Sequence, residues 1–364
     1  MPDKEKVYRL LAINPGSTST KLGVFHNDQA VIQRVIRHPK AEIDQFDSIV
    51  DQKGLRMQII ERMLEENGVD PAGFDAIVGR GGITEPIDSG VYRVNEQMLR
   101  DLTYSSAATH ASALGGIIAA EIGEKYGVPA YVVDPVVVDE LDQNARLTGM
   151  PGIERRCVFH ALNQKAVARR CAADLGSIYE NCRFIVAHMG GGITVGAHRY
   201  GRVIDVNDGL GGEGPFSAER SGGLPVEQLI RMCYSGAYTQ KQMLDRVTRH
   251  GGMMAYLGTN DLIKVEKLIK EGDDFAALVV ESMAYQVAKE IGAMYAVLDG
   301  RVDAIILTGG LAYSTRFTGA IKNRVSLIAP IKVYPGEDEL RALAEGALRV
   351  LRGEETSKGY QGGR

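Results

Sequence analysis

The chain has 364 residues, of which 45% are hydrophobic and 24% are charged, and its formal net charge is -4. This length allows two domains with separate cores, and the composition is that of an ordinary globular protein. It argues against a protein that binds nucleic acid through a basic surface, and no stretch reaches the uncharged apolar length of a membrane span.

The N-terminus and the cysteines predict a cytoplasmic protein. Residues 1–10 mix charges through the part that would be apolar in a signal peptide, so we expect no export. The seven histidines are dispersed, without the HExxH or paired spacing of a zinc site. Four cysteines without CxxC spacing are expected to be free thiols: Cys157, Cys171, Cys182 and Cys233.

The first half predicts a three-stranded meander followed by alternating helices and strands. Two strands flank a turn of small residues at 15–21, and the alternating segment 30–37 predicts a third strand. Apolar residues at helical spacing predict a helix over 51–66, and a further helix is expected over 110–126, ended by Gly127. Short buried strands are expected at 75–78 and 130–133.

The second half repeats this order after a helix at 161–175. Residues 184–206 predict a second meander, and the run 208–225, with six glycines and two prolines, predicts a loop long enough to be functional. A long helix at 274–298, a strand at 303–307 and a last helix at 338–351 follow. The tail after Gly353 is polar and glycine-rich, and we expect it to be disordered.

Two motifs occur once in each half. A strand, a small-residue turn and a strand recur as residues 11–25 and 184–197, and the pattern DAIVGRGG at 75–82 recurs as DAIILTGG at 303–310. The repetition predicts two related α/β domains, with glycine turns that offer backbone N–H groups to the phosphates of a nucleotide. The alternative for any one turn is an ordinary hairpin, but three matched glycine-rich turns favour a binding site.

Residues 14–21 come close to a Walker A loop but lack the glycine before the lysine, and no helix follows. The duplicated strand-turn-strand form instead resembles the acetate and sugar kinase/Hsp70/actin superfamily. Within it, residues 13–21 (INPGSTSTK), 187–192 (AHMGGG) and 219–223 (ERSGG) resemble the signatures of the acetokinase family, closest to butyrate kinase and branched-chain fatty-acid kinase. The resemblance spans roughly residues 7–352.

This resemblance implies an α/β, ribonuclease H-like fold that is duplicated into two domains around a nucleotide cleft. Residues 1–135 with 341–364 would form an N-terminal domain, which has the carboxylate side, the first phosphate loop and the returning C-terminal helix. Residues 136–340 would form the nucleotide-binding domain. The expected partners are small molecules, with neither nucleic acid nor membrane, and a homodimer or higher homo-oligomer is expected.

The implied reaction is a reversible, direct in-line transfer of the γ-phosphoryl group of ATP to butyrate or isobutyrate, giving an acyl phosphate and ADP. Mg²⁺ would be the cofactor and ATP/ADP the co-substrate. An acetate or propionate kinase is one alternative. The other is an ATP-driven conformational switch of the Hsp70 or actin type, which would leave Arg80 and Arg220 without a purpose.

The resemblance also assigns the residues of the reaction. Arg80 and Arg220 would bind the carboxylate and the transferring group, since the planar guanidinium matches both. His188 would donate to the γ-phosphoryl group, and no base is required because the acid is already ionised. Asp134 would act in catalysis and, with Glu339, would hold Mg²⁺, although Glu337 or Asp338 could take the place of Glu339. Surface arginines and helix-start carboxylates are the ordinary alternatives.

The remaining assignments concern the phosphates and the acid. Residues of the two glycine-rich turns and of a third segment would bind the nucleotide: Asn14, Ser17, Ser19, Lys21, Gly190, Gly191, Gly192, Gly309 and Gly310. The acid would contact Arg80, Gly82 and, with a weaker match, His110. Gly81 and Gly82 replace bulky valines of acetate kinases, which predicts room for a longer acyl chain. Gln164 replaces a cleft histidine of acetate kinases, and the nearby His160 is given no role.

Overall fold

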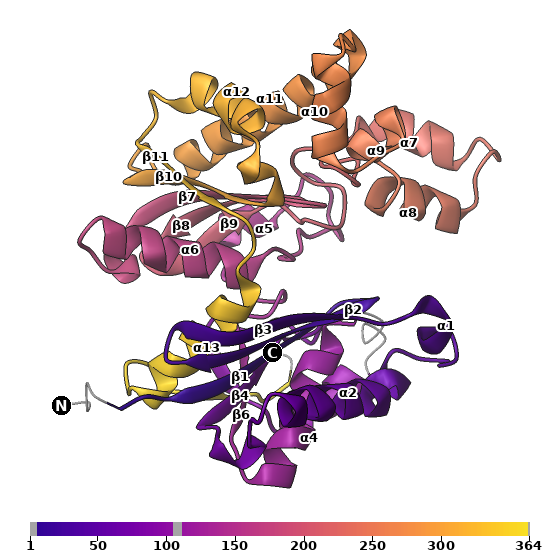
Figure 1. Cartoon of the computed structure of the whole chain (residues 1–364). Helices are drawn as coiled ribbons and strands as arrows, with labels where there is room; N and C mark the ends of the chain where they lie inside the picture. Colours follow the sequence, from indigo (N-terminus) through magenta and orange to yellow (C-terminus); the bar gives the residue numbers. More distant parts are fainter. Residues whose placement is uncertain (1–5, 105–110, 363–364) are drawn as a thin grey trace. The chain divides into compact units, whose positions relative to one another are not determined.

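The computed structural model describes residues 6–104 and 111–362. The chain divides into two compact units, residues 1–138 with 338–364 and residues 139–337. We call them unit 1 and unit 2, and each is described by itself (Figure 1).

Unit 1 is built on a seven-stranded mixed sheet in the order β12-β5-β6-β4-β1-β2-β3. Its strands are β1 (Arg9–Pro15), β2 (Ser19–His26), β3 (Gln29–Arg37), β4 (Ala76–Gly79), β5 (Val91–Arg93), β6 (Ala130–Val133) and β12 (Lys358–Gly359). Its helices are α1 (Lys40–Ile43), α2 (Lys53–Glu66), α3 (Glu96–Tyr104), α4 (Ala113–Tyr126) and α13 (Glu339–Leu351), with the 3₁₀ turns η1 (Val50–Gln52) and η2 (Pro71–Gly73). The expected meander, helices and strands of this half are confirmed.

Helices cover both faces of this sheet. Successive residues of a strand point to opposite faces, so neighbouring residues of one strand contact different helices. In β6, Val132 packs into a cluster with Ala113 and Ile117 of α4. The next residue, Val133, lies against Gly346 of α13. Helix α13 therefore covers the face opposite α4, and its N-terminus, at Glu339, belongs to unit 1.

Unit 2 is built on a five-stranded sheet in the order β11-β10-β7-β8-β9. Its strands are β7 (Arg183–Met189), β8 (Ile193–Arg199), β9 (Arg202–Val206), β10 (Ala304–Gly309) and β11 (Ile331–Pro335). Its helices are α5 (Gln143–Arg146), α6 (Ala161–Asp174), α7 (Val226–Cys233), α8 (Gln240–Thr248), α9 (Gly252–Leu257), α10 (Leu262–Lys270), α11 (Asp274–Val297) and α12 (Thr315–Val325), with η3 (Tyr179–Asn181) and η4 (Gly310–Tyr313). Helix α6 covers one face of the sheet and α11 with α12 the other (Figure 1).

The two sheets share one plan, which confirms the duplicated fold. In each, an antiparallel meander (β1-β2-β3 or β7-β8-β9) is extended by parallel strands, first β4 or β10 and then β6 or β11. The aspartate that opens each DAI motif makes the same two bonds. Asp75 donates its amide to the carbonyl of Arg9 over 2.8 Å and accepts the Arg9 amide at its carboxylate over 2.8 Å. Asp303 does the same with Arg183, over 2.8 and 2.7 Å.

The hairpin turns repeat as well. Asn27, between β2 and β3, and Tyr200, between β8 and β9, both have φ of 53°. Each donates its amide to a residue before the first strand of its meander, Tyr8 or Cys182. The same left-handed residue with the same backbone bond thus extends the structural repeat to the hairpin turns.

The C-terminal tail is ordered through residue 362, so the expectation of disorder is wrong. Strand β12 pairs in parallel with β5, and the Tyr360 ring is 2% exposed in the cluster beside Met98 and Leu102. The Tyr360 hydroxyl also donates to Asp101 over 2.6 Å. One buried aromatic ring thus anchors a segment whose average composition is polar.

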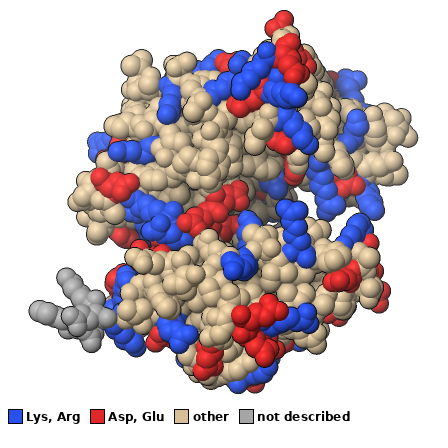
Figure 2. All heavy atoms as spheres, in the orientation of Figure 1, with Lys and Arg blue, Asp and Glu red and all other residues tan. Residues whose placement is uncertain are grey.

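The distribution of surface charge and the state of the cysteines match what the sequence predicts. Basic and acidic side chains are interspersed over the face of each unit seen in Figure 2. The four cysteines are free, with Cys157, Cys171 and Cys182 buried and Cys233 exposed. Within residues 6–104 and 111–362, no helix has the length and apolar character needed to cross a membrane.

Candidate active site

The first predicted phosphate loop is the turn between β1 and β2. The Gly16 amide donates to the Ser19 carbonyl over 2.7 Å and closes the turn. Ser17 at the tip is exposed, while Ser19 and Lys21 are half-buried. The loop therefore presents short polar side chains and backbone groups at the end of two buried strands, as a phosphate-binding turn requires.

Three predicted site residues meet beside this loop. Nη1 of Arg80, which follows β4, lies 2.6 Å from Oε1 of Glu339 at the start of α13. Nδ2 of Asn14 donates to Oε2 of the same carboxylate. The Arg80 side chain remains 25% exposed, so part of its guanidinium can meet a ligand. The cluster joins residues from three separate parts of the sequence within unit 1.

Asp134, the second predicted metal-side residue, follows β6. Its Oδ1 accepts the Gly90 amide over 2.8 Å, and the residue is 1% exposed. Its φ of 36° is strained for a residue with a side chain, and such strain clusters at functional sites.

The carboxylates of Asp134 and Glu339 fit Mg²⁺ in kind, since this ion is commonly held by one or two carboxylates together with substrate phosphates. In the described part of the chain, no group of three or more His, Cys, Asp or Glu residues could hold a metal by itself. A magnesium ion would therefore need the oxygens of the nucleotide. Glu339 would also have to share its charge between that ion and Arg80.

In unit 2, the Gly190–Gly192 turn joins β7 to β8. The Gly190 amide donates to the Gly192 carbonyl over 2.9 Å, and the Ser217 hydroxyl donates to the Gly191 carbonyl over 2.5 Å. A Cβ on Gly192 would stand 1.8 Å from Nη1 of Arg220. The Arg220 guanidinium thus occupies the space of a side chain at 192, and a larger residue there would displace it.

Arg220 therefore contacts the glycine turn directly. Its Nη1 donates to the Gly209 carbonyl, and its Nε is buried without a hydrogen-bond partner. Burial lowers the pKa of Arg220, because little compensates for the desolvation of the cation. A cation held in this way has both charge and donor capacity left for an anion at the turn.

His188 ends β7 immediately before the turn and is 1% exposed. Its Nδ1 is hydrogen-bonded to Oδ1 of Asn163 over 2.8 Å, and its Nε2 is hydrogen-bonded to Oε1 of Glu337 over 3.0 Å. A Cβ on Gly190 would lie 3.1 Å from that same Glu337 oxygen. The Glu337 carboxylate therefore lies beside both the turn and Nε2 of His188.

His160, which the family resemblance left without a role, is stacked face to face on His188. The ring centroids are 3.7 Å apart and the planes differ by 10°. Nδ1 of His160 is hydrogen-bonded to the Thr194 hydroxyl over 2.9 Å. Because His160 is half-buried while His188 is nearly fully buried, the former ring is the more accessible of the two.

Gln164, the replacement for a cleft histidine, is fully buried in a polar network behind the histidine pair. Its amide donates to the Thr194 hydroxyl over 2.8 Å, and its Oε1 accepts from Nε2 of His198 over 2.9 Å. The pKa of His198 is well below its usual value, first because of burial and then because of Lys165 and Arg169. A neutral His198 ring also suits the Tyr179 hydroxyl that donates to its Nδ1 over 2.7 Å.

Gly309 and Gly310 differ in their surroundings. Gly309 has φ of 88°, and a Cβ there would stand 2.4 Å from the carbonyl oxygen of Met189, which precedes the glycine turn. Gly310 is exposed, and a Cβ there would have no neighbouring atom within 4 Å. Close backbone packing accounts for the first glycine, and the second leaves open space in which a ligand can lie against the backbone.

The expectation that Gly81 and Gly82 make room for a longer acid is wrong. A Cβ on Gly82 would stand 2.6 Å from Cα of Ala113, and one on Gly81 would stand 2.6 Å from Val132 and Pro135. Both directions are filled by unit 1 itself, since α4 begins beside Gly82 and the end of β6 lies beside Gly81. These glycines permit close packing and do not open a pocket.

Gly82→Val is therefore expected to destabilise the protein, by about 2 kcal/mol, because the backbone of Ala113 must move. Denaturant unfolding measures this loss, and the ratio of kcat/KM for butyrate and acetate should not change. Gly54→Val, at an exposed position with no atom within 4 Å, is the matched control. Unchanged stability together with a shift toward shorter acids would restore Gly82 as a pocket residue.

Some site residues were missed and one cannot be placed. His110 lies outside the described residues. Arg56, whose guanidinium lies beneath the first phosphate loop, was missed. The sequence did contain an indication of a buried arginine, since position 56 falls on the apolar face of α2, with Ile60 and Met63. No sequence pattern indicated the bond of Asn163 to His188 or the stacking of His160 on His188, because these residues are 25 or more positions apart along the chain.

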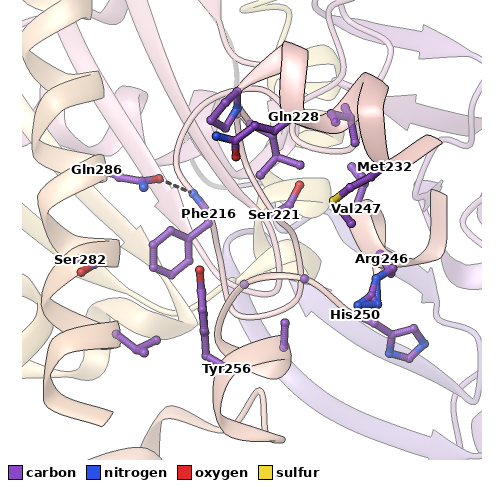
Figure 3. A pocket seen from close by; sticks show the side chains of 18 of the residues that line it. Phe216, Ser221, Gln228, Met232, Arg246, Val247, His250, Tyr256, Ser282 and Gln286 are labelled. Atoms are coloured by element: carbon purple, nitrogen blue, oxygen red, sulfur yellow. Dashed lines mark hydrogen bonds between the residues drawn. The ribbon is translucent and has the colours of Figure 1, made fainter. Parts of the chain in front are cut away.

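A separate pocket of about 810 Å³ lies in unit 2, and Ser221, the residue after Arg220, is part of its lining (Figure 3). Helices α7, α8, α9 and α11 supply most of its wall, which includes Met232, Arg246 and His250. The Phe216 amide donates to Gln286 over 3.0 Å across one side. None of the predicted site residues lines this pocket, so its volume is not evidence for their role.

A family model and several solved structures are similar to this chain. Residues 144–324 match the acetokinase family. This match bears out the resemblance at the level of the acetokinase family, and it does not single out butyrate kinases.

Solved structures share the whole fold. Acetate kinase from Porphyromonas gingivalis matches with a TM-score of 0.80 and 18% identity, over 94% of this chain and 100% of that one. A propionate kinase from Francisella tularensis matches with a TM-score of 0.75 and 18% identity, over 93% and 98% of the two chains. Acetate kinase from Entamoeba histolytica matches with 0.74 and 18%, again over 93% and 98%. The chain therefore has the two-sheet fold of these kinases.

Proposed function

We propose that this protein transfers the γ-phosphoryl group of ATP to the carboxylate of a short-chain fatty acid, giving an acyl phosphate and ADP. The observation that carries the proposal is the convergence of two basic side chains, Arg220 and His188, on one glycine turn. Such a turn suits a multiply charged anion, and little covalent chemistry is left for the protein in phosphoryl transfer. The acetokinase match of residues 144–324 supports the same reaction class.

In the proposed reaction, a carboxylate oxygen attacks the γ-phosphorus, and the bond from that phosphorus to the bridging oxygen of ADP breaks. Arg80 would hold the acid, and Arg220 would stabilise charge on the equatorial oxygens. His188 would donate from Nε2 to the transferring group, which requires the Glu337 carboxylate to give up that bond. Asp134 and Glu339 would hold Mg²⁺, which neutralises phosphate charge when it is bound.

Butyrate or isobutyrate remains our proposed acid on the strength of the sequence motifs alone, because Gly82 does not open a pocket. Acetate and propionate are the alternatives favoured by the fold matches. Trapping the product as its hydroxamate across acids of two to six carbons separates them. We expect kcat/KM to rise from acetate to butyrate, and a maximum at acetate or propionate would overturn this choice of acid.

Asp134→Asn and Glu339→Gln should each raise the magnesium concentration needed for half-maximal activity by at least about tenfold, because each removes a candidate oxygen ligand. Activity is measured against magnesium concentration at saturating ATP and acid. Glu337→Gln is the matched control, since its carboxylate is bonded to His188, and it should leave the magnesium requirement unchanged. If only the Glu337 variant responds, the metal-side residue has been assigned to the wrong carboxylate.

A further inference from the structure

Unit 1 contains a buried cation without a counter-ion. Arg56, on α2, is 1% exposed. No carboxylate forms an ion pair with it within residues 6–104 and 111–362, whereas the less buried Arg155 of unit 2 pairs with Asp205 and Glu213. Since a buried charge is normally paired, the missing negative charge calls for an explanation.

All the acceptors of Arg56 are neutral. Nη1 donates over 2.9, 3.1 and 3.0 Å and Nη2 over 3.1 and 2.9 Å, while Nε is buried without a partner. The acceptors are, in that order, the carbonyls of Gly16 and Ser19, the Thr20 hydroxyl, the Ser17 carbonyl and the Gln52 side-chain amide. Three of the five are backbone carbonyls of the first phosphate loop.

These contacts also orient the loop. The C=O and N–H groups of a trans peptide unit point in opposite directions. Because the carbonyls of Gly16 and Ser17 point at Arg56, the amides of Ser17 and Thr18 point away from it. Both of these residues are exposed. Amides turned outward over a buried positive charge form a concavity suited to an anion.

The charge of Arg56 affects a second buried group. His38 holds the Thr20 hydroxyl through Nε2 over 2.8 Å, and its Nδ1 is buried without a partner. The pKa of His38 is lowered, first by burial and then by the charge of Arg56. His38 is therefore kept neutral and adds no second positive charge beside Arg56.

We propose that Arg56 is the positioning residue of the loop at 15–20 and that a phosphoryl group bound on this loop is the counter-ion that Arg56 lacks. The assignment of that group to ATP rests on the proposed function. Anion binding by the loop does not, and it can be tested without any kinase assay. The rival explanation is that Arg56 only ties the loop to α2, in which case its charge is irrelevant.

Gln52→Glu separates the two explanations. Oε1 of Gln52 accepts from Nη2 of Arg56 over 2.9 Å, so the nearly isosteric glutamate keeps that bond and supplies an internal carboxylate. The Arg56 charge is then neutralised while the loop geometry is retained. Gln33→Glu, on the exposed strand β3 of the same unit, changes the net charge equally and serves as the control.

The probe is inorganic phosphate, added to the full chain. Amide hydrogen exchange of the peptide covering residues 15–20 and the thermal midpoint are measured against phosphate concentration. We expect phosphate to protect this peptide in the wild type and in Gln33→Glu. In Gln52→Glu the apparent dissociation constant should rise about tenfold or more, and the phosphate-free midpoint should increase.

Gln52→Glu binding phosphate as tightly as the wild type would overturn the proposal, and so would a wild-type loop that phosphate does not protect. Arg56→Lys and Arg56→Gln provide an independent comparison if Gln52→Glu does not fold. Lysine, which keeps the charge but loses the planar fork, should retain part of the protection, and glutamine should lose it. Equal protection in both would contradict the proposal. Normal phosphate binding without acid-dependent turnover would instead reject only the proposed function.

Discussion

Replacing Arg220 with alanine should lower kcat by about a hundredfold or more while the chain remains folded. The guanidinium lies on Gly192 and is bound to the protein through the Gly209 carbonyl, so the loss falls mainly on charge stabilisation in the transition state. Removing one such group typically costs about 3 kcal/mol of transition-state stabilisation. Steady-state kinetics at saturating ATP and acid measure the effect, with circular dichroism to confirm the fold.

Two further variants make this prediction specific. Gly192→Ala places a methyl group where Nη1 of Arg220 lies, so it should reproduce much of the loss, and the double variant should be little worse than either single one. Arg246→Ala, which removes an arginine of the same unit from the wall of the separate pocket, should keep normal turnover. Wild-type turnover in Arg220→Ala would reject the assignment.

Loss of the stacked histidines should have an effect of similar size. His188→Ala removes the proposed donor to the γ-phosphoryl group and should lower kcat about a hundredfold. His160→Phe keeps a flat ring against His188 but removes the polar edge of the more accessible ring. We expect it to lower kcat nearly as much, because a phosphoryl group beside the pair would contact both rings.

The His160 variants distinguish a donor from a packing residue. If His160 only supports His188, the phenylalanine variant should retain turnover and His160→Ala should lose it. If His160 donates, both variants should fail. Asn163→Ala, which frees Nδ1 of His188, should give an intermediate loss, because it disturbs the orientation of the donor without removing it. Full activity in His188→Ala would show that the pair is structural.

The fold could be predicted because its evidence is local and occurs twice. The Asp-Ala-Ile motifs at 75 and 303 make the same bonds to Arg9 and Arg183. Strand alternation, helical spacing and Gly127, which ends α4 with φ of 69°, placed the predicted elements to within a few residues, while α3, α7 to α10 and α12 were not predicted. Residues close in sequence decide such features, so one sequence is enough to reveal them.

The site could be predicted only where a motif carries it. Arg220 and Gly192 were each assigned to the phosphates from separate signatures, and the structure brings the two residues into contact. The partnership of Asn14 and Arg80 with Glu339 joins segments more than 250 residues apart, and no spacing encodes it. Their chemical roles remain predictions.

The errors have a common physical cause, which is that composition does not describe surroundings. Gly82 was interpreted as missing volume, but Ala113 fills the space beside it. The tail was expected to be disordered because it is polar, but the ring of Tyr360 packs in an apolar cluster. His160 was given no role because it does not align with the cleft histidine that Gln164 replaces, although its ring is stacked on that of His188.

The most direct test of the proposed reaction is the stoichiometry of ADP and acyl phosphate. Purified protein is incubated with ATP and Mg²⁺, with and without a short-chain fatty acid, and ADP and trapped hydroxamate are measured in the same samples. A carboxylate kinase should release ADP only when the acid is present, with one hydroxamate for each ADP. Slow ADP release that is independent of the acid, without hydroxamate, would contradict the proposal and favour an ATP-driven switch on the same fold.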